Sequence, residues 1–292
     1  MSLDVVILSP VLGAEVRGID GSKPLNDEEI STLRDTYRRH HLVLLRDQRL
    51  TRDDFERLVG YFWPVKRNDD GTPWWTAVSN VDPANGTGTG VLLYHQDEAF
   101  QQPPTASLAL YANQAAPDCA PTTFANAVRA AEVMPPDLRA ALEPLQARHI
   151  VDFRCTEGDS TYRVIERELP SDAPLSRFPR TDHPVFKPVN PDAELALFVT
   201  EHQTSHLQGV SEDAGEVLLQ RCFDVLYADD NTFVHRWQPH DVLVWNNLAL
   251  QHGRPSLVRG GPRDFWRLKT FDSATPACAV PAASTARTAL PA

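Results

Sequence analysis

Short strand-forming segments recur along this chain of 292 residues. The clearest is Leu42–Leu45, a continuous apolar run that predicts a buried strand. Other strands are expected at 4–9, 74–78, 92–97, 106–112, 122–125, 149–153, 183–186, 195–199, 232–237, 241–246 and 266–271. Many short strands, without the alternating strand–helix rhythm of a parallel sheet, predict a mainly β, double-sheet architecture with peripheral helices.

Few helices are expected. Asn26, with Glu29 three residues later, forms a capping-box pattern that begins a helix ending near His40. Three more helices are expected at 51–62, 135–145 and 211–227, the first behind the capping residue Thr51 and the last behind Ser211.

Composition excludes several classes of protein. No run of 18 apolar residues occurs, so no membrane span is expected. The net charge of −11 disfavours binding to nucleic acid, which needs a basic face. The four cysteines show no Cys-x2-Cys spacing and the first residues lack a signal-peptide pattern, so we expect reduced thiols in a cytoplasmic protein. The Ala/Pro/Thr/Ser-rich residues 274–292 are expected to be a disordered tail.

One histidine and one carboxylate stand two residues apart in the segment 92–97. If this segment is extended, His95 and Asp97 project to the same face. Together they supply two thirds of a 2-His-1-carboxylate triad, which suits non-haem Fe(II) and leaves coordination positions open. His-x-Asp alone is common at strand ends and surface turns. His252 is the candidate third ligand far downstream.

One loop-rich stretch and several other histidines are weighed beside this motif. The loop-rich stretch 64–90 leads into His95 and is interpreted as a rim or lid of the site, or as a surface excursion. His202 and His206 stand at i, i+4, but no His-Glu-x-x-His pattern surrounds them, which disfavours a metal site there. The remaining histidine pairs, His40 with His41 and His235 with His240, are interpreted as structural.

Two arginines follow the third candidate ligand. Arg263 and Arg267 share a face if their segment is extended. Two inward-facing guanidiniums are costly when unpaired, which predicts a bound carboxylate. The alternative is that they pair with nearby acids such as Asp264 or Asp272.

Over residues 4–272 the chain resembles the taurine dioxygenase / 2,4-dichlorophenoxyacetate dioxygenase (TauD/TfdA) family of Fe(II)- and 2-oxoglutarate-dependent oxygenases. The segments that carry the resemblance are 13–20, 42–48, 95–97 with Pro103-Pro104, 118–122, 196–199, 236–241 and 245–252. The resemblance implies a double-stranded β-helix core (jelly-roll, cupin-like), in a single oxygenase domain over residues 1–273.

The resemblance also assigns roles to residues of this sequence. His95, Asp97 and His252 match the iron ligands, and no catalytic residue beyond them is expected. Arg263 matches the arginine that holds the distal carboxylate of 2-oxoglutarate. Thr122 matches the threonine that assists it, although Cys119-Ala120-Pro121-Thr122 replaces the usual Gly-Gly-Asp-Thr and leaves Thr123 as the alternative. The residues expected to bind substrate are Arg267, Phe153, His202 and Gln203.

The activity implied by the resemblance uses Fe(II), 2-oxoglutarate and O2, and it yields succinate, CO2 and most simply a hydroxylated product. Asp97 argues for oxygenation, since halogenating members lack this carboxylate. Desaturation, oxidative decarboxylation or cyclisation with the same cofactors is the enzymatic alternative. A metal- or ligand-binding jelly-roll protein without turnover is the non-enzymatic one.

The expected substrate is a small molecule carrying a carboxylate, sulfonate or phosphonate. Taurine is disfavoured, because 65–68 offer no clear counterpart of the histidine and tyrosine that help hold its sulfonate. The apolar Val91-Leu92 and the tryptophans Trp74 and Trp75 suggest a bulkier substrate. We expect a homo-oligomer, a dimer or tetramer, and no nucleic-acid or membrane partner.

Overall fold

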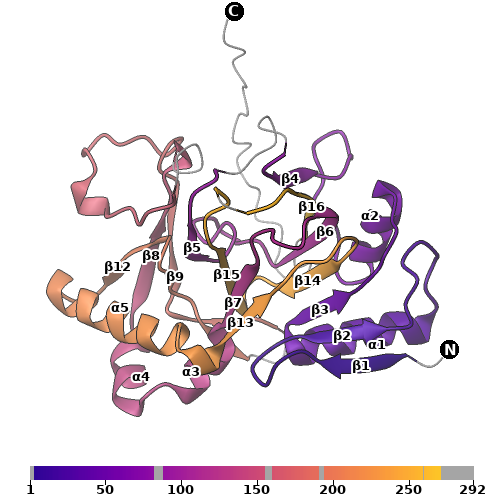
Figure 1. The fold of residues 1–292 in the computed structure, drawn as a ribbon. Coiled ribbons are helices and arrows are strands. Elements are labelled where there is room, and N and C mark those ends of the chain that lie inside the picture. Colours follow the sequence, from indigo (N-terminus) through magenta and orange to yellow (C-terminus); the bar gives the residue numbers. More distant parts are fainter. Residues whose placement is uncertain (1–2, 82–87, 155–159, 191–193, 259, 271–292) are drawn as a thin grey trace, which may run out of the picture.

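The computed structural model describes residues 3–81, 88–154, 160–190, 194–258 and 260–270 (Figure 1). The fold is mixed α/β with more strand than helix. The expected predominance of strands is therefore confirmed. The helices form a larger share of the fold than was expected from the sequence. In the described residues no helix is long and apolar enough to cross a membrane. The predicted tail, 274–292, lies outside the described residues.

The largest sheet has seven strands, and it is antiparallel except where β2 runs parallel to β3. Its spatial order is β1 (Asp4–Ile7), β2 (Ala14–Arg17), β3 (Leu42–Leu45), β14 (Val242–Asn246), β6 (Ser107–Ala115), β16 (Arg263–Thr270) and β4 (Thr76–Ser79). β6 is paired on both sides, with β14 and with β16.

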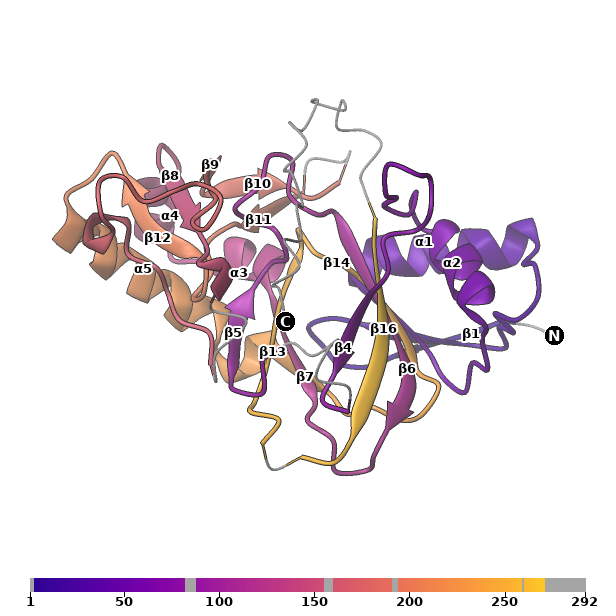
Figure 2. The ribbon, with the colours of Figure 1, turned by 90° about the horizontal axis from the view of Figure 1, so that it is seen from above.

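A second sheet of four strands lies opposite the first (Figure 2). Its order is β13 (Thr232–His235), β7 (Thr122–Asn126), β15 (Leu250–Arg254) and β5 (Leu92–His95). Apolar side chains of both sheets form one core cluster, in which Phe124 of β7 meets Trp245 of β14 with ring centroids 5.4 Å apart. His252 packs on this core, with its ring centroid 5.1 Å from that of Trp245, so the core supports one of the candidate ligands.

Helices cover the outer surfaces. α1 (Asp27–His40) and α2 (Arg52–Gly60) pack on the other face of the large sheet through a second apolar cluster that includes Leu33, Phe55 and Tyr111. α3 (Ala127–Val133), α4 (Pro136–Leu142) and α5 (Glu212–Leu226) lie at the far end of the molecule in Figure 1, where α5 contacts β12. The remaining elements are β12 (Thr204–Gln208), β8 (Gln146–Ile150), β9 (Arg180–Pro184), β10 (Phe186–Pro188), β11 (Leu195–Leu197), η3 (Glu166–Glu168) and η4 (Asp229–Asn231).

Two predictions that rest on neighbouring residues alone are confirmed. Asn26 caps α1 in a full capping box with Glu29, and the buried strand at 42–45 is β3. Several predictions are wrong in their bounds, among them those for β4, which begins at Thr76, β5, which ends at His95, and β8, which spans 146–150. α3 was not predicted, although Asn126 accepts hydrogen bonds from two backbone N–H groups at its start.

Candidate metal centre

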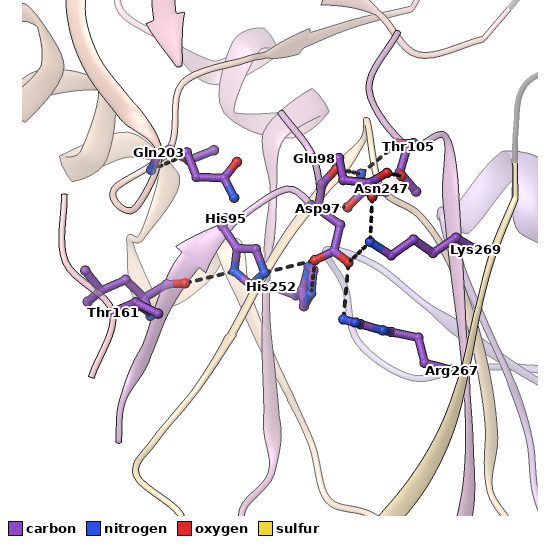
Figure 3. A network of polar contacts seen from close by, with 12 residues as sticks. His95, Asp97, Glu98, Thr105, Thr161, Gln203, Asn247, His252, Arg267 and Lys269 are labelled. Carbon is purple, nitrogen blue, oxygen red and sulfur yellow. Dashed lines mark hydrogen bonds and ion pairs between the residues drawn. The ribbon is translucent and has the colours of Figure 1, made fainter. Parts of the chain in front are cut away.

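His95, Asp97 and His252 converge on one point (Figure 3). His95 and His252 are register partners across the β5–β15 pair. Asp97 Oδ1 lies 3.1 Å from His95 Nε2 and 3.6 Å from His252 Nε2. The three ligand atoms lie within 4.8 Å of one another, and this is the one group of three or more such residues within the described part of the chain.

Asp97 reaches this point from a turn, since β5 ends at His95. The side chain of Asn247 holds the turn: its Oδ1 accepts from the Asp97 N–H at 2.8 Å, and its Nδ2 donates to the Asp97 carbonyl at 3.0 Å and to the Thr105 carbonyl at 2.7 Å. Asn247 follows β14 directly and precedes β15. One buried amide therefore ties the Asp97 turn to the connection that leads to His252.

The protonation states of Asp97 and His252 fit a divalent metal, which binds carboxylate and neutral imidazole. Burial opposes ionisation of Asp97, but Lys269, the contact with His95 and Arg267 together hold its pKa well below the ordinary value. Burial and the neighbouring His95 hold the pKa of His252 well below that of free histidine. His95 Nδ1 lies 3.0 Å from the Leu93 carbonyl, a contact that turns its Nε2 toward the centre.

The other histidines lie outside this group. His202 is buried with its ring 5.7 Å from that of His95, and burial lowers its pKa to about 3. His206 instead contacts Ser205 and lines a groove beside α5. His235 pairs with Asp241, and His240 contacts Tyr111. The i, i+4 pair therefore forms no metal centre among the described residues.

Arg263 lies in a cavity next to the centre, lined also by His95, His252 and Thr122. Arg263 as a whole is 1% exposed, and its guanidinium donates to the Ala120 carbonyl at 3.0 Å and lies over the Phe265 ring at 4.2 Å. No carboxylate of the described residues forms an ion pair with it. Burial and the neighbouring Arg254 lower its pKa to about 9. A buried guanidinium without a counter-ion creates a site for an anion.

Thr122 rather than Thr123 lines this cavity. Its Oγ1 accepts from Trp237 Nε1 at 3.0 Å. Thr122 is buried and Thr123 is half-buried. The structure thus brings Thr122 and Arg263 together, as the sequence comparison with the family suggested.

Arg267 lines the same cavity, despite a register shift between Asp264 and Phe265 in the β16–β6 pair. Its Nε donates to Thr76 Oγ1 at 2.8 Å, and its NH1 lies 3.4 Å from Asp97 Oδ2. The acid beside Arg267 is therefore the candidate metal ligand rather than Asp264, which accepts instead from Asn113. Asp272 lies outside the described residues.

Two lysines near the centre were missed from the sequence. Lys269 Nζ lies 3.2 Å from Asp97 Oδ2 and 3.0 Å from Glu98 Oε1. Lys66 Nζ lies 3.6 Å from Glu98 Oε1 and 3.9 Å from the centroid of the Trp74 ring. A signal for Lys269 existed, because it follows Arg267 by two residues and so shares its face of the strand.

The other residues expected to touch substrate differ in their surroundings. His202 and Gln203 are buried beside the centre, and neither His202 ring nitrogen nor Gln203 Oε1 has a hydrogen-bond partner among the described residues. Phe153 is 48% exposed and its ring meets that of Phe100 edge-on at 5.7 Å. Trp75 packs against Phe55 and Trp266 beside the second core cluster, and it is not among the residues that line the cavity next to the centre.

Comparison with known proteins places the chain among the α-ketoglutarate-dependent dioxygenases, α-ketoglutarate being 2-oxoglutarate. The family model described as "Taurine catabolism dioxygenase TauD, TfdA family" matches residues 5–269, so the chain belongs to this family.

Similar proteins cover nearly the whole chain. The α-ketoglutarate-dependent 2,4-dichlorophenoxyacetate dioxygenase of Cupriavidus pinatubonensis is 25% identical over 94% of this chain and 99% of its own. The α-ketoglutarate-dependent sulfate ester dioxygenase of Pseudomonas putida is 26% identical over 86% of this chain and 84% of its own.

Solved structures show the same fold. The structure of AAD-2 in complex with Mn(II) and N-oxalylglycine superposes with a TM-score of 0.75, at 20% identity, over 92% of this chain and 97% of its own. A putative taurine dioxygenase from Burkholderia xenovorans gives a TM-score of 0.75 at 22% identity, over 92% of each chain.

Proposed function

We propose that this dioxygenase uses Fe(II), α-ketoglutarate and O2 to hydroxylate a small anionic organic molecule, with release of succinate and CO2. The observation that carries the proposal is the buried, uncompensated guanidinium of Arg263 in the same cavity as His95 and His252. A metal centre and an anion site that share one cavity suit a co-substrate that chelates metal at one end and carries a carboxylate at the other.

His95, Asp97 and His252 would hold the metal. Two imidazoles and one carboxylate are the ligand set typical of non-haem Fe(II) oxygenases, which keep open positions for co-substrate. When bound, Fe(II) supplies the site for O2 activation coupled to decarboxylation of α-ketoglutarate. The protein contributes the fixed geometry, and the burial of all three side chains keeps water from that space.

Arg263 and Thr122 would bind the distal carboxylate of α-ketoglutarate. A buried hydrogen bond to a charged group contributes roughly 1.5–3 kcal/mol. We expect the contribution of Arg263 to the binding free energy to lie at the upper end of this range, since the ligand would also remove the penalty of an unpaired buried charge. The hydroxyl of Thr122 can donate to the ligand while its oxygen accepts from Trp237.

The substrate would carry a carboxylate, sulfonate or phosphonate that Arg267 binds. The centre has three cationic side chains and two carboxylates, namely Lys66, Arg267 and Lys269 with Asp97 and Glu98. A bound metal would add further positive charge. The names of the two relatives above, a dichlorophenoxyacetate and a sulfate ester dioxygenase, refer to anionic organic compounds. Phe153, His202 and Gln203 would form the walls around the body of the substrate.

The proposal extends to the fold. The seven- and four-stranded sheets with a shared core would be the two halves of a double-stranded β-helix, in one domain over residues 1–273 that assembles into a dimer or tetramer.

A second outcome with the same cofactors is desaturation. A tyrosine isonitrile desaturase from Pseudomonas aeruginosa is 32% identical over 133 residues, which is 44% of this chain. Mass analysis of the product separates the two outcomes, since hydroxylation adds one oxygen and desaturation removes two hydrogens.

The experiment that tests the proposal measures succinate release by the Fe(II)-loaded protein with α-ketoglutarate and O2, across a panel of small carboxylates, sulfonates and phosphonates. We expect slow release without substrate and stimulation by at least one member of the panel. Absence of succinate under every condition would contradict turnover and favour a binding protein.

A further inference from the structure

The two oxygens of the Asp97 carboxylate face different groups (Figure 3). Oδ1 points to the imidazoles, 3.1 Å from His95 Nε2 and 3.6 Å from His252 Nε2. Oδ2 points to the cations, 3.2 Å from Lys269 Nζ and 3.4 Å from Arg267 NH1. Oδ1 is therefore the oxygen placed to share a metal with both histidines, while Oδ2 is paired with the two cations.

Lys269 is itself held in place. Its ammonium lies 3.0 Å from Glu98 Oε1, and Glu98 Oε2 accepts a hydrogen bond from Thr105. The backbone of Glu98 has a φ of 60°, which residues other than glycine seldom adopt and which surrounding contacts must maintain. Only 13% of the Lys269 side chain is exposed, so few other positions are open to the ammonium. Glu98 and Thr105 thus fix Lys269 where it meets Asp97.

We propose that Lys269 is a positioning residue that fixes Asp97 so that the carboxylate binds the metal through Oδ1 only. This inference rests on the metal centre proposed above. A carboxylate that bound through both oxygens would occupy a position that the 2-His-1-carboxylate set leaves open. Groups that hold a ligand from outside the coordination sphere typically matter about 10–100-fold in metal affinity.

Positioning of Asp97 by Lys269 would strengthen metal binding, whereas the positive charge of Lys269 would weaken it. A cation next to the centre repels Fe(II), and the repulsion is strong where water is excluded. If Lys269 served only to neutralise buried carboxylates, its removal would tighten Fe(II) binding. If Lys269 positions Asp97, its removal weakens Fe(II) binding. The sign of the change therefore separates the two roles.

The test is the dissociation constant of Fe(II), measured anaerobically without α-ketoglutarate, for the wild type and two variants. Lys269→Met should weaken Fe(II) binding by about 10–100-fold. Lys187→Met is the matched control, because it removes a half-buried lysine of β10 that lies over the Phe198 ring. It should leave the constant within about twofold of the wild type. Fe(II) binding by Lys269→Met that equals or exceeds that of the wild type would overturn the inference.

A second readout addresses the single-oxygen coordination. At saturating Fe(II), α-ketoglutarate should bind Lys269→Met more weakly, because the released Asp97 Oδ2 competes for a position at the metal. Unchanged α-ketoglutarate affinity would contradict this part. Failure of the wild type to bind Fe(II) would instead refute the proposed metal centre, so the two failures are distinguishable.

Should Lys269→Met not fold, Glu98→Gln provides the same test. It keeps the length of the side chain and an oxygen for Thr105, but it removes the charge that holds Lys269. We expect weaker Fe(II) binding by a smaller factor, and unchanged binding would overturn the inference.

Discussion

His95 and His252 face each other across the β5–β15 pair, with their ring centroids 4.2 Å apart. Their spacing depends on the close approach of two backbones. Directly after His252, a Cβ atom built at Gly253 would lie 2.8 Å from the Leu92 carbonyl oxygen and 3.3 Å from the Tyr94 nitrogen. Glycine at this position therefore permits the two histidines to share one metal.

Gly253→Ala should push β5 away from β15, with a cost of about 1–3 kcal/mol in unfolding free energy and a loss of Fe(II) affinity. Gly60→Ala is the control, because no atom lies within 4 Å of its added Cβ. Thermal unfolding and Fe(II) titration of both variants measure the effect. Equal stability and equal Fe(II) affinity of Gly253→Ala and wild type would contradict it.

Asn247→Ala should impair the metal centre from outside it. The change leaves the N–H and carbonyl of Asp97 and the carbonyl of Thr105 without their partner, and each unsatisfied buried group costs about 1–3 kcal/mol. We expect a large drop in the urea midpoint and weaker Fe(II) binding. Asn113→Ala, which removes an exposed contact to Asp264, should change neither. A wild-type urea midpoint for Asn247→Ala would refute the role of this amide.

Two buried histidines away from the metal centre should make the fold acid-sensitive. His149 and His183 lie 5.6 Å apart between ring centroids. Burial lowers the pKa of His183 to about 4 and that of His149 well below the ordinary 6.5. Because the unfolded chain takes up these protons first, stability is intact above pH 6.5 and falls as pH drops below it, by about 1.4 kcal/mol per pH unit and histidine.

Urea unfolding of the metal-free protein between pH 7 and pH 5 checks this dependence. His183→Gln can still donate to the Gln101 carbonyl. This variant should reduce the slope of unfolding free energy against pH by the contribution of one histidine. An identical slope in the variant and the wild type would show that His183 does not titrate as its burial implies.

Arg267→Gln should raise the KM of an anionic substrate by at least about tenfold, since a guanidinium binds carboxylate or sulfonate with two hydrogen bonds. The KM of a substrate analogue with a neutral group in place of the anion serves as the control and should change far less. Equal effects on both compounds would show that Arg267 acts through Asp97, which it also contacts.

The parts of the fold that sequence predicted have local causes. The capping box of Asn26 and Glu29 and the apolar run of β3 need no distant partner to be recognised. The roles of His252 and Arg263 came from motifs of a family, and the structure then brought these residues into one cavity.

The parts that sequence missed depend on distant residues. β5 stops at His95 because the next residues enter a turn held by Asn247, which lies 150 positions further on. Lys269 meets Asp97 because β16 brings this lysine beside the turn, and Trp75 meets Trp266, another residue of β16. Such pairings depend on strand register, which local patterns do not encode.

The central claim is that one cavity holds both a metal and α-ketoglutarate, and an anaerobic titration tests it most directly. Fe(II)-loaded wild type should develop the visible metal-to-ligand absorption band typical of this family as α-ketoglutarate is added. Arg263→Met should bind Fe(II) normally but require about 10–150-fold more α-ketoglutarate for the same band. Absence of the band in wild type with Fe(II) bound, or an unchanged titration in Arg263→Met, would contradict the account.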